Sequence, residues 1–162
     1  MKSYINGIAC ISVQPTFLTP HFLDEALKVT PEEVCYAQEP SYKEYIAPNA
    51  SRRMAKGVKM AIASAAEALK EAHISTPDAI LVGTGMGCLQ DSEKFLTALI
   101  NDNEEHLTPT AFIQSTHNTV AGQIALLLQC KGENFTYVNG AVSFESALLD
   151  AKMQMEQDTI NT

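Results

Sequence analysis

Paired cysteines, long apolar runs and basic residues are all scarce in this chain of 162 residues. The four cysteines are scattered, with no Cys-x-x-Cys pair, which argues against a disulfide framework or a thiolate metal site. No apolar run approaches the length of a membrane span, and the N-terminus lacks the apolar centre and cleavage site of a secretory signal. We therefore expect a cytoplasmic protein with no membrane span, no metal site and no cofactor.

Positive charge is in short supply. Lysine and arginine number 11 against 19 acidic residues, so the formal net charge is −8. Such a chain repels phosphate backbones, which excludes nucleic-acid binding unless a local basic patch exists. The one compact basic cluster consists of Arg52, Arg53, Lys56 and Lys59. Hydrophobic residues make up 46% of the chain, enough for a packed core, so intrinsic disorder is excluded for most of it.

Strand-like and helical segments alternate along the chain. The predicted strands are residues 4–13, 79–82 and 134–139, and the predicted long helices are residues 51–72, 91–100, 118–130 and 142–157. We expect Ser51 to be the N-cap of the first long helix and Gly132 to stop the third. Residues 14–49 hold five prolines and allow only short helical pieces, at 22–28 and 31–36, and residues 101–109 form a polar loop. The alternation predicts an α/β fold with a mostly parallel sheet and helices on both faces.

The glycines of residues 83–87 follow a predicted strand and precede a helix, where a phosphate could bind at the helix N-terminus. The dinucleotide motif Gly-x-Gly-x-x-Gly is not matched, because Cys88 stands where its third glycine belongs. The Walker spacing is absent too. We therefore interpret these glycines as a tight turn at the end of a strand.

Two polar groups are candidate functional residues. His117 and Asn118 lie at the predicted start of a helix, where His117 could act as a base or as a donor to a substrate. The alternative is a structural role, with Ser115, Thr116 or Asn118 as the helix cap. The other histidines have no metal-ligand spacing.

The third predicted strand ends in a sharp turn at Gly140, a place where several enzyme classes carry a nucleophile. The residue at the tip is Ala141, whose methyl group has no lone pair with which to attack. Ser143 follows two residues later. A hydrolase that uses Ser143 and His117 stays open as an alternative, although the motif Gly-x-Ser-x-Gly is not matched.

Five short motifs in order resemble the N-terminal part of a β-ketoacyl synthase, in the thiolase-like superfamily. They are Arg52-Arg53-Met54, residues 80–87 (ILVGTGMG), Ser115-Thr116-His117-Asn118, Ala121-Gly122-Gln123-Ile124 and residues 131–136 (KGENFT). The His-Asn and Ala-Gly pairs are similar to those of the subgroup found near aryl-polyene and related pigment pathways. The resemblance implies a single domain over residues 1–162, most securely over 51–152, with a partial thiolase-like fold.

The same resemblance places Ala141 at the position of the family's cysteine nucleophile and Ser143 at the position of a family serine. The family's further catalytic residues lie in a C-terminal half, and this sequence ends at Thr162, before that half begins. His117 matches neither of the family's catalytic histidines. The resemblance therefore implies that the condensing chemistry is absent.

Three functions remain open. The first is a catalytically silent subunit in fatty-acid, polyketide or aryl-polyene biosynthesis. The second is an active acyltransferase component that uses a residue such as His117 or Ser143, and the third is a vestigial dimeric fragment. The family pairs the strand before the nucleophile across a dimer interface, so residues 134–139 imply a homodimer or a heterodimer with a full-length synthase. An acyl carrier protein is a further candidate partner, with the basic cluster as the one candidate docking surface. The alternative, which we prefer, is that this cluster is simply the solvated face of the first long helix.

Overall fold

A computed structural model describes residues 2–19 and 34–162. Its helices are α1 (Pro48–Ser51), α2 (Lys56–Glu71), α3 (Leu89–Asn101), α4 (Pro109–Ser115), α5 (Thr119–Leu128) and α6 (Ser143–Glu156), with a short 3-10 helix η1 (Gly140–Val142). Its strands are β1 (Ala79–Gly83) and β2 (Glu133–Tyr137).

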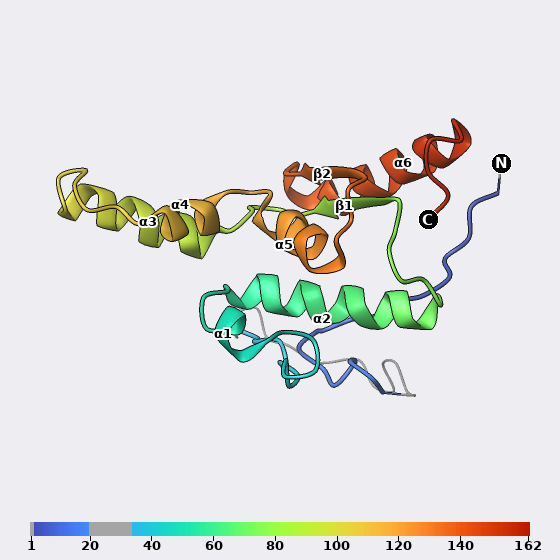
Figure 1. Ribbon diagram of the computed structural model, residues 1–162, viewed down its shortest axis with the longest axis horizontal. Helices are drawn as coiled ribbons and strands as arrows, with labels where there is room; N and C mark the ends of the chain where they lie inside the picture. The colour runs from blue at the N-terminus through green and yellow to red at the C-terminus, as the bar shows by residue number, and fades with distance from the viewer. Residues whose placement is uncertain (1, 20–33) are drawn as a thin grey trace.

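The two strands form a parallel sheet, with Ala79 opposite Glu133 and Gly83 opposite Tyr137. Helices α2 and α5 lie on one side of the sheet and α6 lies on the other (Figure 1). The prediction of an α/β fold with a parallel sheet and helices on both faces is therefore confirmed. The strands predicted at 79–82 and 134–139 are confirmed too, within two residues at their ends.

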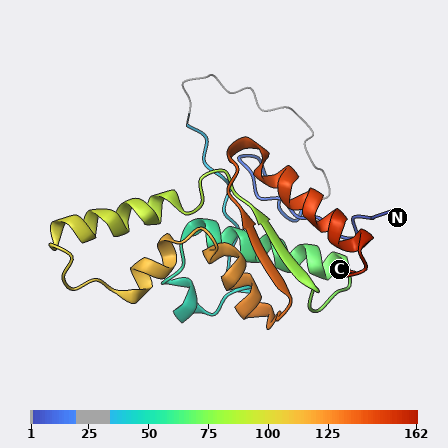
Figure 2. The ribbon, with the colours of Figure 1, turned by 90° about the horizontal axis from the view of Figure 1, so that it is seen from above.

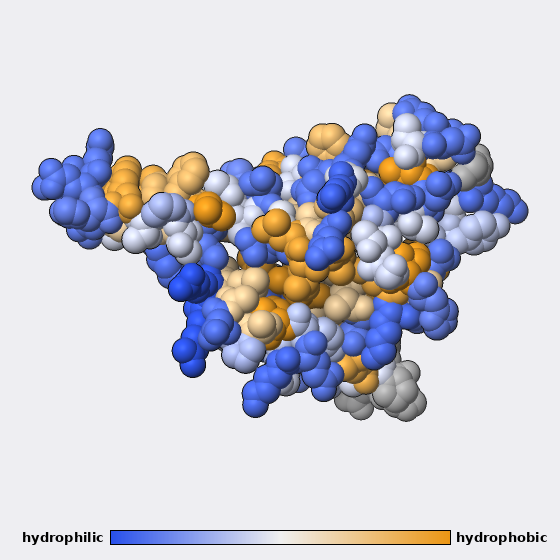
Figure 3. All heavy atoms as spheres, in the orientation of Figure 1, coloured by the Kyte–Doolittle hydropathy of each residue, from blue (hydrophilic) through white to orange (hydrophobic). Residues whose placement is uncertain are grey.

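The core lies between the sheet and the helices α2 and α5. Its buried members are Ile46, Val58, Ile62, Ile80, Ala121 and Ile124. Val58 and Ile62 are spaced four residues apart, so both point from α2 to the same side. Figure 3 shows hydrophobic residues gathered between α2 and the sheet, and again along the arm that α3 and α4 form.

The long helix predicted over residues 51–72 is interrupted, and Ser51 is not its N-cap. Pro48 begins the one-turn helix α1, which ends at Ser51, and α2 begins only at Lys56 after an extended Ala55. The amide of Gln114 holds this break open: its nitrogen donates to the Arg53 carbonyl (2.5 Å) and its oxygen accepts from the Ala55 N–H (3.2 Å). Sequence periodicity could not reveal it, because Gln114 is distant along the chain.

The strand predicted over residues 4–13 is absent. This segment runs beside α2, where the Ile8 N–H donates to the Glu71 carboxylate (2.7 Å). Gly7 lies so close to the Ala68 carbonyl that a side chain at residue 7 would collide with it. Contact with a helix has therefore replaced strand pairing. Of the short helices predicted at 22–28 and 31–36, residues 34–36 are not helical and the others lie outside the described residues.

Helices α3 and α4 form an arm that projects from the rest of the molecule (Figures 1 and 2). The helix predicted over 91–100 is confirmed as α3, whereas α4 was not predicted. Thr108 caps α4 by accepting from the Ala111 N–H, and Pro109 follows as its first residue. Phe112 of α4 packs edge-on against Phe95 of α3, with ring centres 5.8 Å apart. The Thr-Pro pair is the sequence signal that could have identified α4.

The helices predicted over 118–130 and 142–157 are confirmed as α5 and α6. Gly132 is not the residue that stops α5, because the helix ends at Leu128 and Gln129 takes the left-handed conformation (φ 54°). Gly132 instead packs against the Asp78 carbonyl at the start of β1.

We predict that Gly83→Ala lowers the free energy of unfolding by about 1–3 kcal/mol, as overpacking does. A methyl group at residue 83 would lie 2.6 Å from the Cα of Phe144, so α6 would have to move off the sheet. The matched control is Gly122→Ala in the interior of α5, where the new methyl meets nothing within 4 Å. That variant should gain up to about 1 kcal/mol from helix propensity. Urea unfolding measures the stability of both variants. Equal unfolding midpoints would contradict the close packing of Gly83 against α6.

Candidate functional site

The carboxyl ends of β1 and β2 meet at one edge of the sheet, as they must in a parallel pair. We call residues 84–87, His117 and residues 139–143 the carboxyl edge. The Thr84 N–H donates to the Tyr137 carbonyl (2.9 Å), which joins the two strand ends. The Thr84 hydroxyl accepts from the Gly87 N–H (3.1 Å), and Gly87 has a φ of +65°. The interpretation of these glycines as a tight turn therefore agrees with the geometry.

Ala141 lies in η1, directly after β2 and before α6, and is exposed. Gly140 precedes it with a φ of +60°, the left-handed conformation that favours glycine. The predicted strand, tight turn and helix are thus present around Ala141. That this residue occupies the nucleophile position of a family stays a prediction.

Ser143 is 3% exposed, and its hydroxyl is engaged on both sides. It accepts from the Asn139 N–H (2.8 Å) and donates to the Gly140 carbonyl (2.7 Å). These bonds tie the end of β2 to the first residue of α6. The hydroxyl therefore has a structural role, because its hydrogen already points at a carbonyl within the turn.

His117 and Asn118 are both exposed, in the short connection between α4 and α5. Asn118 is the N-cap residue of α5 by position, but its side chain makes no capping hydrogen bond. The imidazole of His117 lies against Gly87, so the glycine turn leaves room for it. Gly85 in the same turn approaches the Gly140 carbonyl, 3.5 Å from the place of a Cβ.

The carboxyl edge therefore brings His117 and the turn around Ala141 against the same glycine loop. Among the described residues, no hydrogen bond joins His117 to Ser143. The serine–histidine arrangement considered above is thus not assembled in this structure.

A cavity of about 450 Å³ adjoins this edge, between the N-terminal ends of α2 and α3. Cys88 is among its lining residues, and sequence reasoning missed this placement because Cys88 looked like a small core residue. Burial and the neighbouring Asp91 carboxylate raise the pKa of the Cys88 thiol. A raised pKa leaves less thiolate at neutral pH, so Cys88 is a weak nucleophile.

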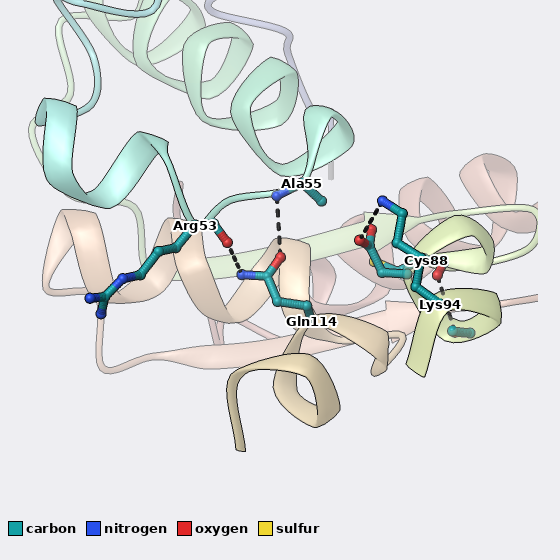
Figure 4. Close-up of polar contacts among 7 residues, drawn as sticks. Arg53, Ala55, Cys88, Lys94 and Gln114 are labelled. Carbon is teal, nitrogen blue, oxygen red and sulfur yellow. Dashed lines mark hydrogen bonds and ion pairs between the residues drawn. The ribbon is translucent and has the colours of Figure 1, made fainter. Parts of the chain in front are cut away.

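A second hollow, which we call the basic cleft, lies between the α1–α2 connection and the arm. It has a volume of about 370 Å³, and its cationic lining residues are Arg52, Arg53, Lys56 and Lys94. Figure 4 shows Gln114 bridging Arg53 and Ala55 beside Lys94 in this region. The basic cleft therefore differs in one member from the basic cluster predicted from the sequence. Lys94 of α3 lines the cleft, whereas Lys59 does not. Lys59 instead lies over the Tyr42 ring, 5.4 Å from its centre.

Two of the four cations in the basic cleft are paired. Lys56 binds Glu39 (2.8 Å) and Lys94 binds Asp91 (3.6 Å). The contact with Lys56 lowers the pKa of Glu39 and raises that of Lys56. Neither Arg52 nor Arg53 has an ion-pair partner within the described part of the chain, so both guanidinium groups are available to an anionic surface.

Within residues 2–19 and 34–162, no group of three or more His, Cys, Asp or Glu side chains is arranged to hold a metal ion. No helix among these residues is long and apolar enough to cross a membrane.

Comparisons with known proteins give a consistent family. The family described as the β-ketoacyl synthase N-terminal domain matches residues 29–161. One similar solved structure is that of the ketosynthase ApeO in complex with its chain length factor ApeC, from Xenorhabdus doucetiae. The similarity has a TM-score of 0.64 at 20% identity and covers 80% of this chain. It covers 52% of the solved chain, so the present sequence spans about half of that protein's length. No curated protein sequence matches this chain.

We predict that Ser143→Ala lowers the free energy of unfolding by about 1 kcal/mol, because the Asn139 N–H loses its acceptor in this part-buried turn. Ser146→Ala is the control, since Ser146 also lies in α6 and bonds to Val142 but is partly exposed. Its effect should stay within about 0.5 kcal/mol. Equal losses in the two variants, measured by chemical unfolding, would contradict the structural role of Ser143.

Proposed function

The chain belongs to the β-ketoacyl synthase family through its N-terminal domain, and from this premise we propose that it is a catalytically silent subunit of a synthase. The pathway would be fatty-acid, polyketide or aryl-polyene biosynthesis. The proposal rests on one observation, the alanine at the tip of the turn between β2 and α6.

Condensation of two acyl groups by this family needs a nucleophile that holds one acyl chain as a covalent intermediate. The resemblance places that nucleophile at residue 141, where a methyl group can neither attack a thioester nor lose a proton. Ser143 does not replace it, because its hydroxyl is buried and donates to the Gly140 carbonyl. Cys88 does not replace it either, because burial raises its pKa and disfavours the thiolate.

The second proposal is that the chain is an active acyltransferase component, in which His117 accepts the acyl group or a proton. Its supporting observation is that His117 is exposed and lies against the glycine turn, close to the turn that holds Ala141. The third proposal is a vestigial dimeric fragment, which requires no reaction at any of these residues. The alanine at residue 141 favours the first proposal over the second.

We propose that a ketosynthase-like chain is the partner and that the free edge of β2 is the contact. Within the described residues, β2 has β1 as its only strand neighbour, so its outer edge presents unpaired N–H and C=O groups. The similar solved structure is itself a ketosynthase in complex with a chain length factor, which supports a heterodimer of related chains.

An acyl carrier protein is the further partner that the basic cleft suits. Carrier proteins are acidic, and Arg52 and Arg53 offer two exposed guanidinium groups to such a surface. The net charge of −8 works against long-range attraction by this chain alone. We therefore propose that the acyl carrier protein contacts both this chain and its full-length partner when it docks.

We predict that the pure protein does not condense acyl and malonyl carrier-protein substrates and acquires no acyl adduct. Intact-mass spectrometry after incubation with an acyl thioester checks the second point. His117→Ala and Ser143→Ala serve as matched variants. An adduct of the native protein that disappears in either variant would overturn the silent role and establish the acyltransferase.

We also predict that gentle purification from native cells yields a full-length ketosynthase in stoichiometric amount. In that complex, hydrogen–deuterium exchange should slow at the amides of β2, because their free edge becomes paired. The amides of the α3–α4 connection are the internal control and should keep their rate. A protein recovered alone, with β2 exchanging as fast as before, would contradict the heterodimer.

A further inference from the structure

The break between α1 and α2 has no local cause in the sequence. Residues 52–55 (RRMA) all have high helix propensity, and the segment contains neither proline nor glycine. Ala55 is the N-cap residue of α2, a position that disfavours alanine because its side chain cannot accept a hydrogen bond. Local preference therefore favours one continuous helix, as the hydrophobic spacing of this region also does.

Gln114 of α4 satisfies the backbone groups that the break exposes. In a continuous helix, the Ala55 N–H would donate to the carbonyl of Ser51, and the Arg53 carbonyl would accept from the N–H of Gly57. In the structure, the amide group of Gln114 takes both roles, as Figure 4 shows. Within the described residues, no other hydrogen bond joins residues 52–56 to the arm. Gln114 therefore caps two helix ends at once.

Contacts within the arm hold Gln114 in place. The Ser92 hydroxyl of α3 donates to the carbonyl of Ser115, the residue after Gln114 (2.8 Å). The edge-on contact of Phe95 with Phe112 fixes the same end of α4 against α3. The position of Gln114 is therefore set by the arm and not by the segment that it binds.

The same contact joins the two walls of the basic cleft. Residues 52–56 line one wall, and residues of α3 and α4, including Lys94 and Gln114 itself, line the other. We propose that Gln114 is a positioning residue for this cleft. It keeps α2 from extending back through residues 52–55, and so holds Arg52 and Arg53 in the wall opposite Lys94. The functional meaning of this role rests on the carrier-protein docking proposed above.

The alternative conformation is compatible with the core but not with the cleft. Met54 packs against the core and lies four residues before Val58, so a continuous helix would keep both on its buried face. Arg52 and Arg53 would then lie about 120° and 140° around the helix axis from Val58, on the solvent side of α2. Loss of Gln114 would thus cost the cleft its arginine pair and leave the core intact.

The first test is Gln114→Leu in the full chain, which removes both hydrogen bonds at nearly constant size. Residues 56–58 form the first turn of α2, and no side chain caps this end. If α2 extends backwards, the carbonyls of residues 52–54 pair with these amides. Their hydrogen–deuterium exchange should then slow by ~10-fold or more. A side chain that only stabilised the fold would leave this exchange as fast as before, or faster.

The second test restores the break by another route. Ala55→Ser, added to Gln114→Leu, gives α2 an N-cap side chain of its own, which can accept from the Val58 N–H. The fast exchange of residues 56–58 should return. Binding of a purified acyl carrier protein, titrated at low ionic strength, should follow the same order. Gln114→Leu should weaken it by ~10-fold, and the double variant should recover the native affinity.

Gln90→Leu is the matched control. Gln90 also lines the basic cleft, but among the described residues it makes no hydrogen bond to residues 52–55. The same substitution there should change neither the exchange of residues 56–58 nor the affinity for the carrier protein.

Each result separates this inference from the docking function. Unchanged or faster exchange of residues 56–58 in Gln114→Leu would overturn the role of Gln114, whatever the carrier protein does. Slower exchange with native affinity for the carrier protein would show that the break does not position the arginines for docking, and would also overturn it. A native chain that binds no carrier protein would overturn the docking proposal, while the exchange rates still decide whether Gln114 holds the break.

Discussion

The parallel pairing of β1 with β2 is the constraint on which the rest of the structure depends. Two strands that run in the same direction bring both carboxyl ends to one edge, so the glycine turn after β1 and the turn around Ala141 become neighbours. Gly83 completes the arrangement, because the absence of a side chain there lets the first residues of α6 approach the sheet. The carboxyl edge is a consequence of this pairing and of that one close contact.

The two faces of the sheet are covered to different degrees. Helices α2 and α5 enclose the core on one face, whereas α6 covers the other and itself presents an apolar outer surface. The free edge of β2 and the outer face of α6 are thus two different surfaces that a partner could cover, one through backbone hydrogen bonds and the other through side-chain packing.

The chemistry of the carboxyl edge is consistent with a structural purpose for its polar groups. The Ser143 hydroxyl holds a turn together, the Thr84 hydroxyl stabilises the glycine loop, and burial and the Asp91 carboxylate raise the pKa of the Cys88 thiol. His117 is the one exposed titratable side chain in this group, and it lies on glycine backbone instead of on another polar side chain. At this edge the serine and threonine hydroxyls are therefore engaged in local hydrogen bonds, whereas His117 is exposed.

Much of this followed from local pattern. Strongly periodic or β-branched segments predicted α2, α3, α5, α6 and both strands, because hydrophobic spacing is a property of neighbouring residues. The motifs at residues 52–54, 80–87, 115–118, 121–124 and 131–136 likewise indicated the family. Tertiary contacts decided the remainder: Gln114 holds the break before α2, and Glu71 keeps residues 4–13 beside a helix and out of the sheet. They also decided that Lys94 joins the basic cleft and that Ser143 is buried, since these depend on residues brought together only by the fold.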